Sequence, residues 1–575
     1  MTANHNTRNA TGIPRAVEGG ESITPSTLRI GRRYRPQRLD SDYDAIIIGS
    51  GIGGLTTAAC LSKTGRKVLV LEQHYTAGGF THSYARHGYE WDVGVHYIGD
   101  VGRRSSLTRR LFDFISDGQL QWAPMDDNYD RFFIGEERFD VTAGRTRFVA
   151  SLKQRFPSEA TAIEEYMRRL DAANKAVRVL SVEKLFNGIP GKLFRLARKT
   201  ALPDYLNRTT YEVLRELTDD EMLIAVLTGQ WGDSGVCPKD SSFMIHCLIA
   251  RHYLNGAFYP IGGASNIAKT IIPVVQRTGG EVFTYADVQQ ILVKAGKVHG
   301  VRMRDGTEIS APIVISNAGV LNTFDRLLPA GVSRKYGYDR LIRRVKPSIA
   351  HLGVYIGIRE SAEKLGLPKT NFWIYPDTAH KENLAAFEAD YHAEFPAVYI
   401  SFPSAKDPAW ESRYPNTATI EIVAPAFFEL FEPWKDQPWG KRGEDYDALK
   451  DYFTGRLLEH LYAKLPQLRG KIEYCELSTP LSTNFFNAYR KGEMYGLAHD
   501  PARFEQAWLC PKTSIRGLYL TGQDVLSCGV GGAMFAGFLC AISALGLKSA
   551  GLLRKFATNS KVNAPVAGVT GKAPG

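Results

Sequence analysis

The chain has 575 residues, of which 44% are hydrophobic and 23% are charged, and its formal net charge is +11 at pH 7. This length and composition predict more than one domain and a sizeable core, and they exclude a largely disordered protein. The positive charge favours anionic surfaces in general. No zinc knuckle, RNA-recognition aromatic motif or helix-turn-helix spacing occurs, so we expect no nucleic-acid partner.

The cysteines and histidines indicate whether disulfides or metal sites are to be expected. Seven cysteines lie singly along the chain without a CxxC pair, which favours a reducing compartment and argues against disulfides or a thiolate zinc site. The histidines show no metal-ligand spacing such as HExxH, so we expect no metal centre. Residues 1–41 are polar, and we predict a disordered tail. The pair Arg32-Arg33 resembles the start of an export signal, but no apolar segment follows it, so the predicted location is the cytoplasm.

The first predicted domain segment, residues 42–125, opens with a nucleotide-binding pattern. An apolar strand leads through Gly49, Gly51 and Gly54 into a helix, and a second apolar strand ends in Glu72. Glycines at this spacing permit a tight turn, close approach of the backbone to a pyrophosphate, and close helix–strand packing. The helix N-terminus attracts phosphate, and an acid about 20 positions further on can bind ribose hydroxyls. The segment therefore predicts a dinucleotide site.

Residues 126–254 form a second segment, which we expect to be helical and part of a substrate domain. Amphipathic runs at 160–179 and 214–227 indicate helices. The stretch 184–199 holds five basic and no acidic residues among apolar ones. Such a stretch can lie on an anionic bilayer, but a domain-packing helix with a solvated basic face fits equally well, and Pro190 weakens the membrane interpretation.

Four further segments complete the predicted organisation. Residues 255–345 contain a glycine turn, a helix and four short strands, which we assign to the nucleotide domain. Residues 346–504 contain four longer strands rich in β-branched and aromatic residues, which predict an antiparallel sheet that covers a pocket. Residues 505–550 return to the nucleotide domain, and 551–575 form a predicted tail. The sequence thus predicts an α/β fold, in which a discontinuous three-layer domain of Rossmann type carries an inserted α+β substrate domain.

One segment imitates a membrane span. Residues 525–547 contain no charge and are long enough to cross a bilayer. The glycines Gly529, Gly531 and Gly532 at its start fit a helix N-terminus that faces a ligand better than a helix that faces lipid. The strand-like run 517–522 before it also indicates strand, turn and helix. We therefore favour a buried cofactor-binding helix over a transmembrane helix, which hydropathy by itself does not separate.

Several motifs together resemble those of the phytoene desaturase-like FAD oxidoreductases. They are the 49–72 unit, the double glycine at 78–79, the 91–97 segment, the turn at 259–263 and the 520–533 segment. Within this family the finer likeness is to the retinol saturases. The segments that carry it are 229–233 (Gly-Gln-Trp-Gly-Asp), 402–408, 495–500 and 518–525. The likeness spans residues 42–547.

The resemblance implies FAD bound across the nucleotide domain, with the double glycine beneath the flavin, the Val288 backbone at the adenine and Asp524 at the ribityl or phosphate region. A helix that starts near Gly532 would direct its N-terminus at the flavin N1–O2 edge. The residues that it assigns to the cofactor are Gly49, Gly51, Ile52, Gly53, Gly54, Glu72, Gln73, Gly78, Gly79, Val288, Gly522, Asp524, Gly531, Gly532 and Ala533. The chain departs from the amine-oxidase pattern, because Phe80 stands where that pattern has an Arg. This departure favours a hydrophobic substrate over an amine.

Few side chains are obligatory for flavin chemistry at a carbon–carbon bond, because the cofactor performs the chemistry. We predict His96 as a proton donor at the flavin face, and a hydrogen-bonded loop histidine is the alternative. Tyr495, with Glu493 nearby, is the second candidate for protonating a carbon, against a packed turn tyrosine. The 229–233 motif suits either a loop against a ligand or a tight turn between helices. Cys528 is expected to be a small buried residue.

The resemblance to retinol saturases implies reduction of a carbon–carbon double bond in a hydrophobic polyene or unsaturated lipid. Desaturation or isomerisation of a carotenoid or fatty chain stays open, because the same flavin geometry supports hydride transfer in either direction. A non-enzymatic lipid carrier of the GDP-dissociation-inhibitor type is the alternative of another class, and the complete flavin set argues against it. The predicted partners are this lipid, an unidentified electron donor or acceptor and, through 184–199, the inner face of a membrane.

Overall fold

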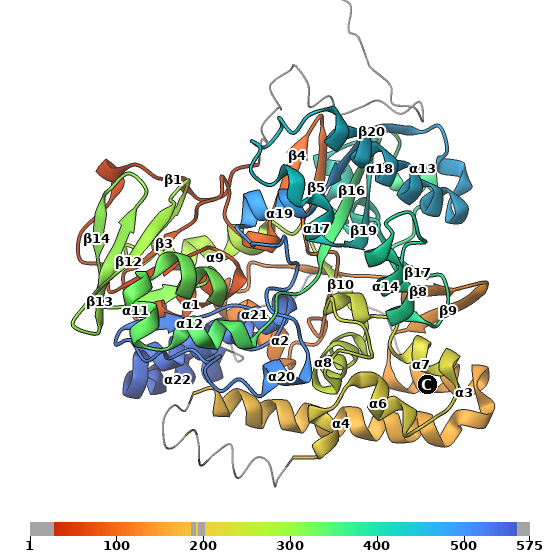
Figure 1. Cartoon of the computed structure of the whole chain (residues 1–575), viewed down its shortest axis with the longest axis horizontal. Coiled ribbons are helices and arrows are strands. Elements are labelled where there is room, and N and C mark those ends of the chain that lie inside the picture. The colour runs from red at the N-terminus through yellow and green to blue at the C-terminus, as the bar shows by residue number, and fades with distance from the viewer. Residues whose placement is uncertain (1–27, 186–190, 192, 194–201, 560–575) are drawn as a thin grey trace, which may run out of the picture.

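The computed structural model describes residues 28–185, 191, 193 and 202–559. Two large sheets organise this part of the chain (Figure 1). The sheet that contains β1 and β3 lies at the left of the view, and the sheet that contains β16, β19 and β8 lies at the right, above a layer of helices. The functional cavity described below is formed between them.

The left-hand sheet has six strands, all parallel, in the order β1-β11-β3-β2-β15-β21. Its strands are β1 (Arg32–Arg33), β2 (Ala45–Ile48), β3 (Val68–Leu71), β11 (Glu281–Thr284), β15 (Val314–Ser316) and β21 (Leu518–Leu520). β2 and β3 consist of apolar residues that are all buried, as is typical of parallel strands covered on both faces. Strands far apart in the sequence thus build one sheet, as predicted.

Different elements cover the two faces of this sheet. Helices share a core with Ile47 and Val70 on one face. They are α1 (Ile52–Ser62), α2 (Leu107–Ile115), α9 (Asn266–Gln276) and α21 (Gly529–Leu545). A small antiparallel sheet shares a core with Ile46 and Leu69 on the other face. Its strands are β12 (Val288–Lys294), β13 (Lys297–Met303) and β14 (Glu308–Ser310). The three layers confirm the predicted α/β fold class.

Helix α21 accounts for the segment that imitates a membrane span. It packs along α1, and Ala536, Cys540 and Ala541 are fully buried. Together with α22 (Ser549–Asn559) it makes the one helix among the described residues that is long and apolar enough to cross a membrane, and 39% of its most apolar stretch is buried. The helix therefore belongs to the nucleotide domain along its inner face, while its outer face is apolar enough to allow membrane association.

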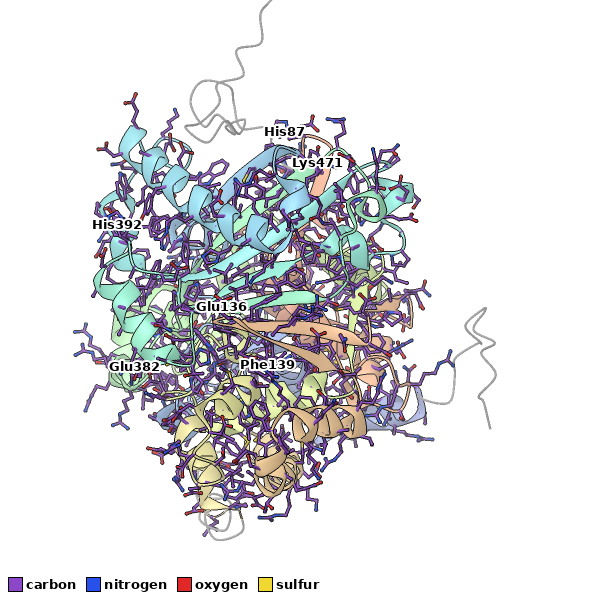
Figure 2. The ribbon with its side chains drawn as sticks, turned by 90° about the vertical axis from the view of Figure 1, so that its right-hand side faces the viewer. His87, Glu136, Phe139, Glu382, His392 and Lys471 are labelled. Atoms are coloured by element: carbon purple, nitrogen blue, oxygen red, sulfur yellow. The ribbon has the colours of Figure 1, made fainter. Side chains whose placement is uncertain are left out.

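The right-hand sheet has seven strands in the order β20-β16-β19-β18-β17-β8-β9, and all neighbours are antiparallel except β17 and β8. Its strands are β8 (Asn128–Ile134), β9 (Glu137–Thr142), β16 (Ala350–Ile358), β17 (Asn371–Tyr375), β18 (Val398–Ser401), β19 (Ala418–Ala426) and β20 (Ile472–Ser478). The four predicted strands are β16 to β19. The β8–β9 hairpin corrects the expectation that residues 126–254 are helical, because its main chain extends the sheet beyond β17. Figure 2 shows this hairpin, with Glu136 in its turn and Phe139 on β9.

The two faces of this sheet have separate cores, because alternation along β17 sends Phe372 to one face and Trp373 to the other. Helix α18 (Glu444–Lys464) covers the Phe372 face. Helices from the earlier part of the chain cover the Trp373 face. They are α3 (Arg145–Arg155), α4 (Ala160–Glu183), α6 (Thr210–Arg215), α7 (Glu221–Leu227) and α8 (Phe243–Tyr253). The run predicted at 160–179 is thus α4, and the run at 214–227 is divided between α6 and α7.

Short elements connect the two large sheets. The strands are β4 (Ser83–Arg86), β5 (Tyr89–Asp92), β6 (Ile98–Gly99), β7 (Trp122–Pro124) and β10 (Ala257–Pro260). The remaining helices are α10 (Val320–Asn322), α11 (Ala330–Lys335), α12 (Tyr338–Leu341), α13 (Ala362–Leu365), α14 (His380–Ala389), α15 (Pro403–Lys406), α16 (Trp410–Arg413), α17 (Phe428–Phe431), α19 (Pro480–Asn487) and α20 (Pro501–Phe504). The β4–β5 hairpin packs Trp91 against Tyr355 of β16, so it is anchored on the seven-stranded sheet.

Both predicted tails contain regular structure. Strand β1 pairs in parallel with β11, which corrects the prediction that residues 1–41 are disordered throughout. An edge strand pairs through its main chain and needs no apolar side chains, so the polar sequence gave no signal. Helix α22 likewise corrects the predicted tail 551–575, and its Leu552 is fully buried. Residues 1–27 and 560–575 lie outside the described residues, as does most of the stretch 184–199.

Candidate active site

A cavity of about 250 Å³ lies between the nucleotide domain and the seven-stranded sheet. Most of the residues predicted for the site line it. These are Gly49, Gly51, Ile52, Gly53, Glu72, Gln73, Gly78, Gly79, His96, Val288, Tyr495, Gly522, Asp524 and Ala533. Gly54, Glu493, Gly531 and Gly532 are not among its lining residues. The cavity therefore brings together the motifs at both ends of the chain.

The glycine turn after β2 leaves no room for side chains. Gly49 has a φ of 94°, which favours glycine, and a Cβ atom on Gly53 would lie 2.7 Å from the Cα of Gly522. Gly54 instead faces the Gly49 carbonyl, where a Cβ atom would clash, so it serves the close packing of helix and strand. The N-terminus of α1 thereby approaches β21 and leaves its first N–H groups facing the cavity.

Glu72 is held in place by the same turn. Its Oε2 accepts hydrogen bonds from the Ser50 backbone N–H (2.8 Å) and the Ser50 hydroxyl (2.7 Å), while Oε1 accepts one from the His74 backbone N–H (2.8 Å). An ionised carboxylate oxygen can accept two hydrogen bonds. Oε1 therefore keeps capacity for a ribose hydroxyl, which fits the predicted role.

Asp524 ties three chain segments together. Its Oδ2 accepts a hydrogen bond from the Val320 N–H at 2.8 Å and its Oδ1 accepts one from the Leu497 N–H at 3.0 Å. The carboxylate thus fixes the loops that follow β15 and Tyr495 around the cavity. Its contact with the ribityl or phosphate region stays a prediction.

The N-terminus of α21 points to the cavity, but the helix begins earlier than predicted. It starts at Gly529 after Cys528, and Gly529, Val530 and Ala533 line the cavity. This corrects the expected start near Gly532, whose Cα packs against Ser527 so closely that a Cβ atom would clash. A helix N-terminus at this position can stabilise negative charge on a bound ring.

These observations test whether FAD fits the site. The glycine turn, the free Oε1 capacity of Glu72 and two helix N-termini together suit the pyrophosphate, ribose and anionic ring of a flavin dinucleotide. Gly78 and Gly79 line the same cavity between the two helices, where a Cβ atom on Gly79 would lie 2.9 Å from the Gly51 Cα. The residues present therefore fit the cofactor.

His96 lies on the cavity wall and is fixed by an acid that the sequence did not single out. Its Nδ1 lies 2.7 Å from Oε2 of Glu421, a fully buried residue of β19. Glu421 also accepts the Asp92 N–H through Oε1 at 2.6 Å. Burial raises the pKa of Glu421 to about 8, and burial together with the nearby Lys406 ammonium lowers the pKa of His96 to about 3. The pair therefore holds a neutral imidazole with Nδ1 engaged.

Lys406 fixes the main chain at His96. Its ammonium donates hydrogen bonds to the His96 carbonyl (3.0 Å) and the Ser401 hydroxyl (2.7 Å), and it also contacts the Asn371 side-chain oxygen. Burial lowers the pKa of Lys406 to about 7. The residue belongs to the 402–408 motif, which the sequence marked only as a family likeness.

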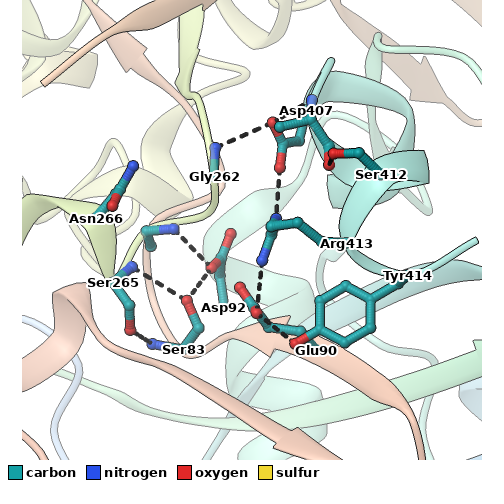
Figure 3. Close-up of polar contacts among 12 residues, drawn as sticks. Ser83, Glu90, Asp92, Gly262, Ser265, Asn266, Asp407, Ser412, Arg413 and Tyr414 are labelled. Carbon is teal, nitrogen blue, oxygen red and sulfur yellow. Dashed lines mark hydrogen bonds and ion pairs between the residues drawn. The ribbon is translucent and has the colours of Figure 1, made fainter. Parts of the chain in front are cut away.

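A polar cluster behind His96 explains two other motifs (Figure 3). Asp92 Oδ1 accepts hydrogen bonds from the Ser83 hydroxyl (2.7 Å) and the Ala264 N–H (3.0 Å), and its Oδ2 contacts the Tyr259 hydroxyl. Arg413 bridges Glu90 and Asp407, each at 2.7 Å. The 91–97 and 259–263 motifs are therefore joined, and the cluster holds the β4–β5 hairpin against the turn before α9.

Tyr495 and Glu493 lie in different surroundings. Tyr495 lines the cavity, where it packs next to Gly235, and its backbone N–H donates to the Ser348 hydroxyl at 2.9 Å. Glu493 is buried away from the cavity and accepts the Lys491 N–H at 2.7 Å in its own loop. This corrects the expectation that Glu493 assists Tyr495, because its carboxylate serves the loop.

The 229–233 motif is a loop that faces the cavity. A Cβ atom on Gly232 would lie 2.6 Å from the Trp373 indole, so this segment packs directly against the sheet. Trp373 belongs to an aromatic row of the sheet, formed by His351, Trp373 and Tyr399, which lines the cavity. Asp233 lines the cavity, and its Oδ2 lies 3.0 Å from the Tyr97 hydroxyl oxygen. The motif is a tight turn between α7 and α8 that also faces the cavity, so both interpretations of it agree with the structure.

The aromatic row leaves three polar atoms without a hydrogen-bond partner among the described residues. They are Trp373 Nε1, the Tyr399 hydroxyl and His351 Nδ1. All three residues line the cavity and are at least 94% buried. Buried polar groups in native proteins are usually paired, so unpaired ones on a cavity wall indicate a polar atom of a ligand. Trp373 and Tyr399 are neighbours, with ring centroids 4.5 Å apart.

Comparisons with known proteins agree with this site. Residues 47–115 match the NAD(P)-binding Rossmann-like domain. The chain is 38% identical to all-trans-retinol 13,14-reductase of Danio rerio over 553 residues, which cover 92% of this chain and 91% of that protein. It is 27% identical to the chloroplastic prolycopene isomerase of Arabidopsis thaliana, over 92% of this chain and 87% of that protein.

Among solved structures, a putrescine oxidase variant superposes with a TM-score of 0.58 at 14% identity, over 89% of this chain and 99% of the other. The fold and the site define an oxidoreductase of the phytoene desaturase-like FAD class. Within that class, the identity over nearly the whole length shows that the chain belongs to the family of all-trans-retinol 13,14-reductases.

Proposed function

We propose that this protein uses FAD to reduce a carbon–carbon double bond in a hydrophobic polyene that carries a neutral polar oxygen at one end. The observation that carries the proposal is the composition of the cavity. One end has the glycine turn and helix N-termini of the FAD site, and the other end is an aromatic wall with three unpaired polar atoms. The name of the retinol reductase relative describes the same reaction and such a substrate.

The polar groups around the aromatic wall favour a hydroxyl group over a carboxylate. Trp373 and Tyr399 can each donate a hydrogen bond to a ligand oxygen. Among the described residues around this wall no cation is free, since the Lys406 ammonium is already engaged with His96, Ser401 and Asn371. A substrate carboxylate would be buried there without a counter-ion, so a neutral oxygen fits better.

Bound FAD supplies the exchange of an electron pair, as hydride, with a carbon of the substrate. The chain positions the polyene between the double glycine and the aromatic row, and these walls exclude water. The N-terminus of α21 stabilises negative charge on the cofactor side. The reaction also needs a proton donor at the cavity, and His96 and Tyr495, the two donors predicted from the sequence, both line it. An external electron donor must restore the reduced state after each turnover.

Anaerobic incubation with all-trans-retinol tests the proposal. FAD-loaded protein reduced with dithionite is expected to convert retinol into a product with two additional hydrogen atoms, detected by liquid chromatography and mass spectrometry. Reduced FAD without protein is the control. Recovery of unchanged retinol would contradict the proposal. A product of unchanged mass but altered geometry, or conversion of a cis-carotene hydrocarbon only, would favour the isomerase or desaturase alternative that the prolycopene isomerase likeness supports.

We also propose that the protein works in the cytoplasm and touches the inner face of a membrane without spanning it. The basic composition of 184–199 and the apolar helix of α21 and α22 support this. Leu193 within the basic stretch and Leu547 between α21 and α22 are exposed, at 63% and 100%. Flotation with anionic vesicles is expected to carry the purified protein without detergent, and neutral vesicles are expected to carry less. Equal recovery in the unbound fraction with both would contradict the membrane contact.

A further inference from the structure

Two carboxyl groups and one phenol meet beside the cavity, and one of them, Asp233, lines it. The Tyr97 hydroxyl lies 3.0 Å from Asp233 Oδ2 and 3.2 Å from Asp130 Oδ2. Tyr97 follows β5, Asp130 lies on β8, and Asp233 ends the loop that covers Trp373. Asp130 is fully buried and Tyr97 nearly so. Three distant parts of the chain thus place two acids around one hydroxyl group.

This arrangement requires one of the two carboxyl groups to be protonated. A tyrosine hydroxyl carries one hydrogen, so it can donate to only one of the two acids. Two ionised carboxylates around the same hydroxyl in a buried site would repel each other, and like charges at such a separation hold one acid in its protonated form. Both contacts are satisfied when Tyr97 donates to the ionised carboxylate and accepts from the protonated one.

The partners of each acid show which one holds the proton. Burial raises the pKa of Asp130 to about 6, but its N–H hydrogen bonds from Asn371 (2.8 Å) and Gln230 (2.7 Å) and the charge of Lys406 favour its ionised form. Among the described residues, the side-chain partners of Asp233 are the hydroxyl groups of Tyr97 and Tyr253. Burial, with the Asp130 charge in addition, raises the pKa of Asp233 to about 8. Asp233 is therefore the neutral acid near pH 7.

Asp233 also occupies the right place in the cavity. Its backbone carbonyl contacts the thiol of Cys528 at 3.5 Å, directly before α21, whose N-terminus faces the cofactor side. The unpaired Trp373 and Tyr399 groups lie on the same cavity wall. The other candidates are weaker acids, because burial raises the pKa of Tyr495 well above its ordinary value and His96 has its Nδ1 engaged. The best general acid has a pKa near the working pH.

We propose that Asp233 is the acid that protonates the substrate carbon, a role that rests on the proposed function. Bound reduced FAD would supply a hydride to one carbon of the double bond, and the π electron pair would move to the neighbouring carbon. That carbon takes the proton of Asp233, so the alkene is reduced, FAD is oxidised and Asp233 becomes a carboxylate. After the product leaves, the Asp233 carboxylate takes a proton back from solvent water, because Asp130 is ionised and holds no proton to pass through Tyr97.

The protonated state of Asp233 is testable without turnover. Infrared difference spectra of wild type minus Asp233→Asn, recorded at pH 7 without substrate, are expected to show the carbonyl band of a protonated carboxylic acid that shifts in D₂O. Glu473→Gln is the control, because Glu473 lies in an exposed ion pair with Arg359 that lowers its pKa, and wild type minus this variant should lack the band. A spectrum in which Asp233→Asn removes an ionised carboxylate instead would overturn the proposal.

The catalytic role is tested by single turnover. Asp233→Asn is expected to slow polyene reduction by about 100-fold or more, the size of a general-acid contribution. Its FAD content and its reduction by dithionite should match wild type, and Asp233→Glu should recover part of the rate. An Asp233→Asn variant as fast as wild type would overturn this role while the proposed function stands. A wild-type protein that reduces no polyene would instead refute the proposed function, and the role of Asp233 with it.

Discussion

The two ends of the cavity hold their ligands by different means. The cofactor end is built from main chain: glycines without side chains, helix N-termini, and one acid, Glu72, whose position the turn itself fixes. The substrate end is built from side chains on four strands and a loop, among them Trp373, Tyr399 and His351. Backbone sites depend on local spacing, whereas side-chain sites depend on how distant strands come into register.

This difference predicts different responses to substitution. At the cofactor end, a single methyl group meets backbone atoms that have no alternative position. At the substrate end, a lost hydrogen bond leaves the fold and the cofactor in place. We therefore expect the largest effects from substitutions at the cofactor end and the smallest from those at the substrate end.

Gly53→Val is expected to abolish FAD retention. Its Cβ atom would lie 2.7 Å from the Gly522 Cα and 2.8 Å from the Asn317 side-chain oxygen, so α1 and β21 would have to separate. Flavin absorbance of the purified protein after reconstitution measures the effect. Gly331→Ala is the matched control, because a Cβ atom at Gly331 meets nothing within 4 Å. Retention of a full complement of FAD by Gly53→Val would show that the turn tolerates side chains.

The same contrast explains which parts could be predicted from the sequence. The nucleotide motif lies within residues 44–72, and strand, turn, helix and acid are all local, so most of the residues predicted there, though not Gly54, line the cavity. The hairpin β8–β9 and the edge strand β1 escaped notice, because main-chain pairing with distant strands creates them. Glu493 was chosen for its nearness to Tyr495 in sequence, yet successive residues of a loop can face opposite ways.

The residues at the substrate end were harder to predict from the sequence. Glu421 is an acid within the apolar strand 417–423, and a buried charge in such a strand is rare enough to suggest a partner. Lys406 and Asp233 lie in motifs that were noted as family likeness but without a role. Their neighbours His96, Asn371 and Tyr97 come from other segments of the chain. The pairing of β17, β18 and β19 helps to bring these segments together, and no single segment predicts that pairing.

Glu421→Gln is expected to lower the rate of polyene reduction by about tenfold to 100-fold, because the acid that orients His96 on the cavity wall is lost. The amide keeps a contact with the Asp92 N–H but loses the acid that shares a proton with His96 Nδ1. FAD content should not change, since Glu421 does not line the cavity. Glu473→Gln, on β20 in an exposed ion pair with Arg359, is the control. A normal rate in Glu421→Gln would assign His96 a structural role.

The same variant is expected to change how stability depends on pH. Burial raises the pKa of Glu421 from 4.5 to about 8, so the folded protein binds this proton more tightly than the unfolded chain. The stabilising effect is complete below about pH 4.5 and is lost as the pH rises toward 8, at a rate of at most about 1.4 kcal/mol per pH unit. The free energy of unfolding of wild type minus that of Glu421→Gln should therefore fall between pH 5 and 8, measured by urea unfolding. A constant difference would show that Glu421 is ionised in the fold.

Tyr399→Phe is expected to have the smallest effect and to act only at the substrate end. The ring remains packed against Trp373, while the hydroxyl, which has no partner among the described residues, is removed. A neutral hydrogen bond contributes about 1 kcal/mol, so KM for a polyene alcohol should rise about fivefold with little change in kcat. The KM for a hydrocarbon polyene of similar length, or the fluorescence-measured Kd where it is not turned over, should not change. An equal loss for alcohol and hydrocarbon would mean that Tyr399 shapes the apolar wall and that the oxygen is bound elsewhere in the cavity.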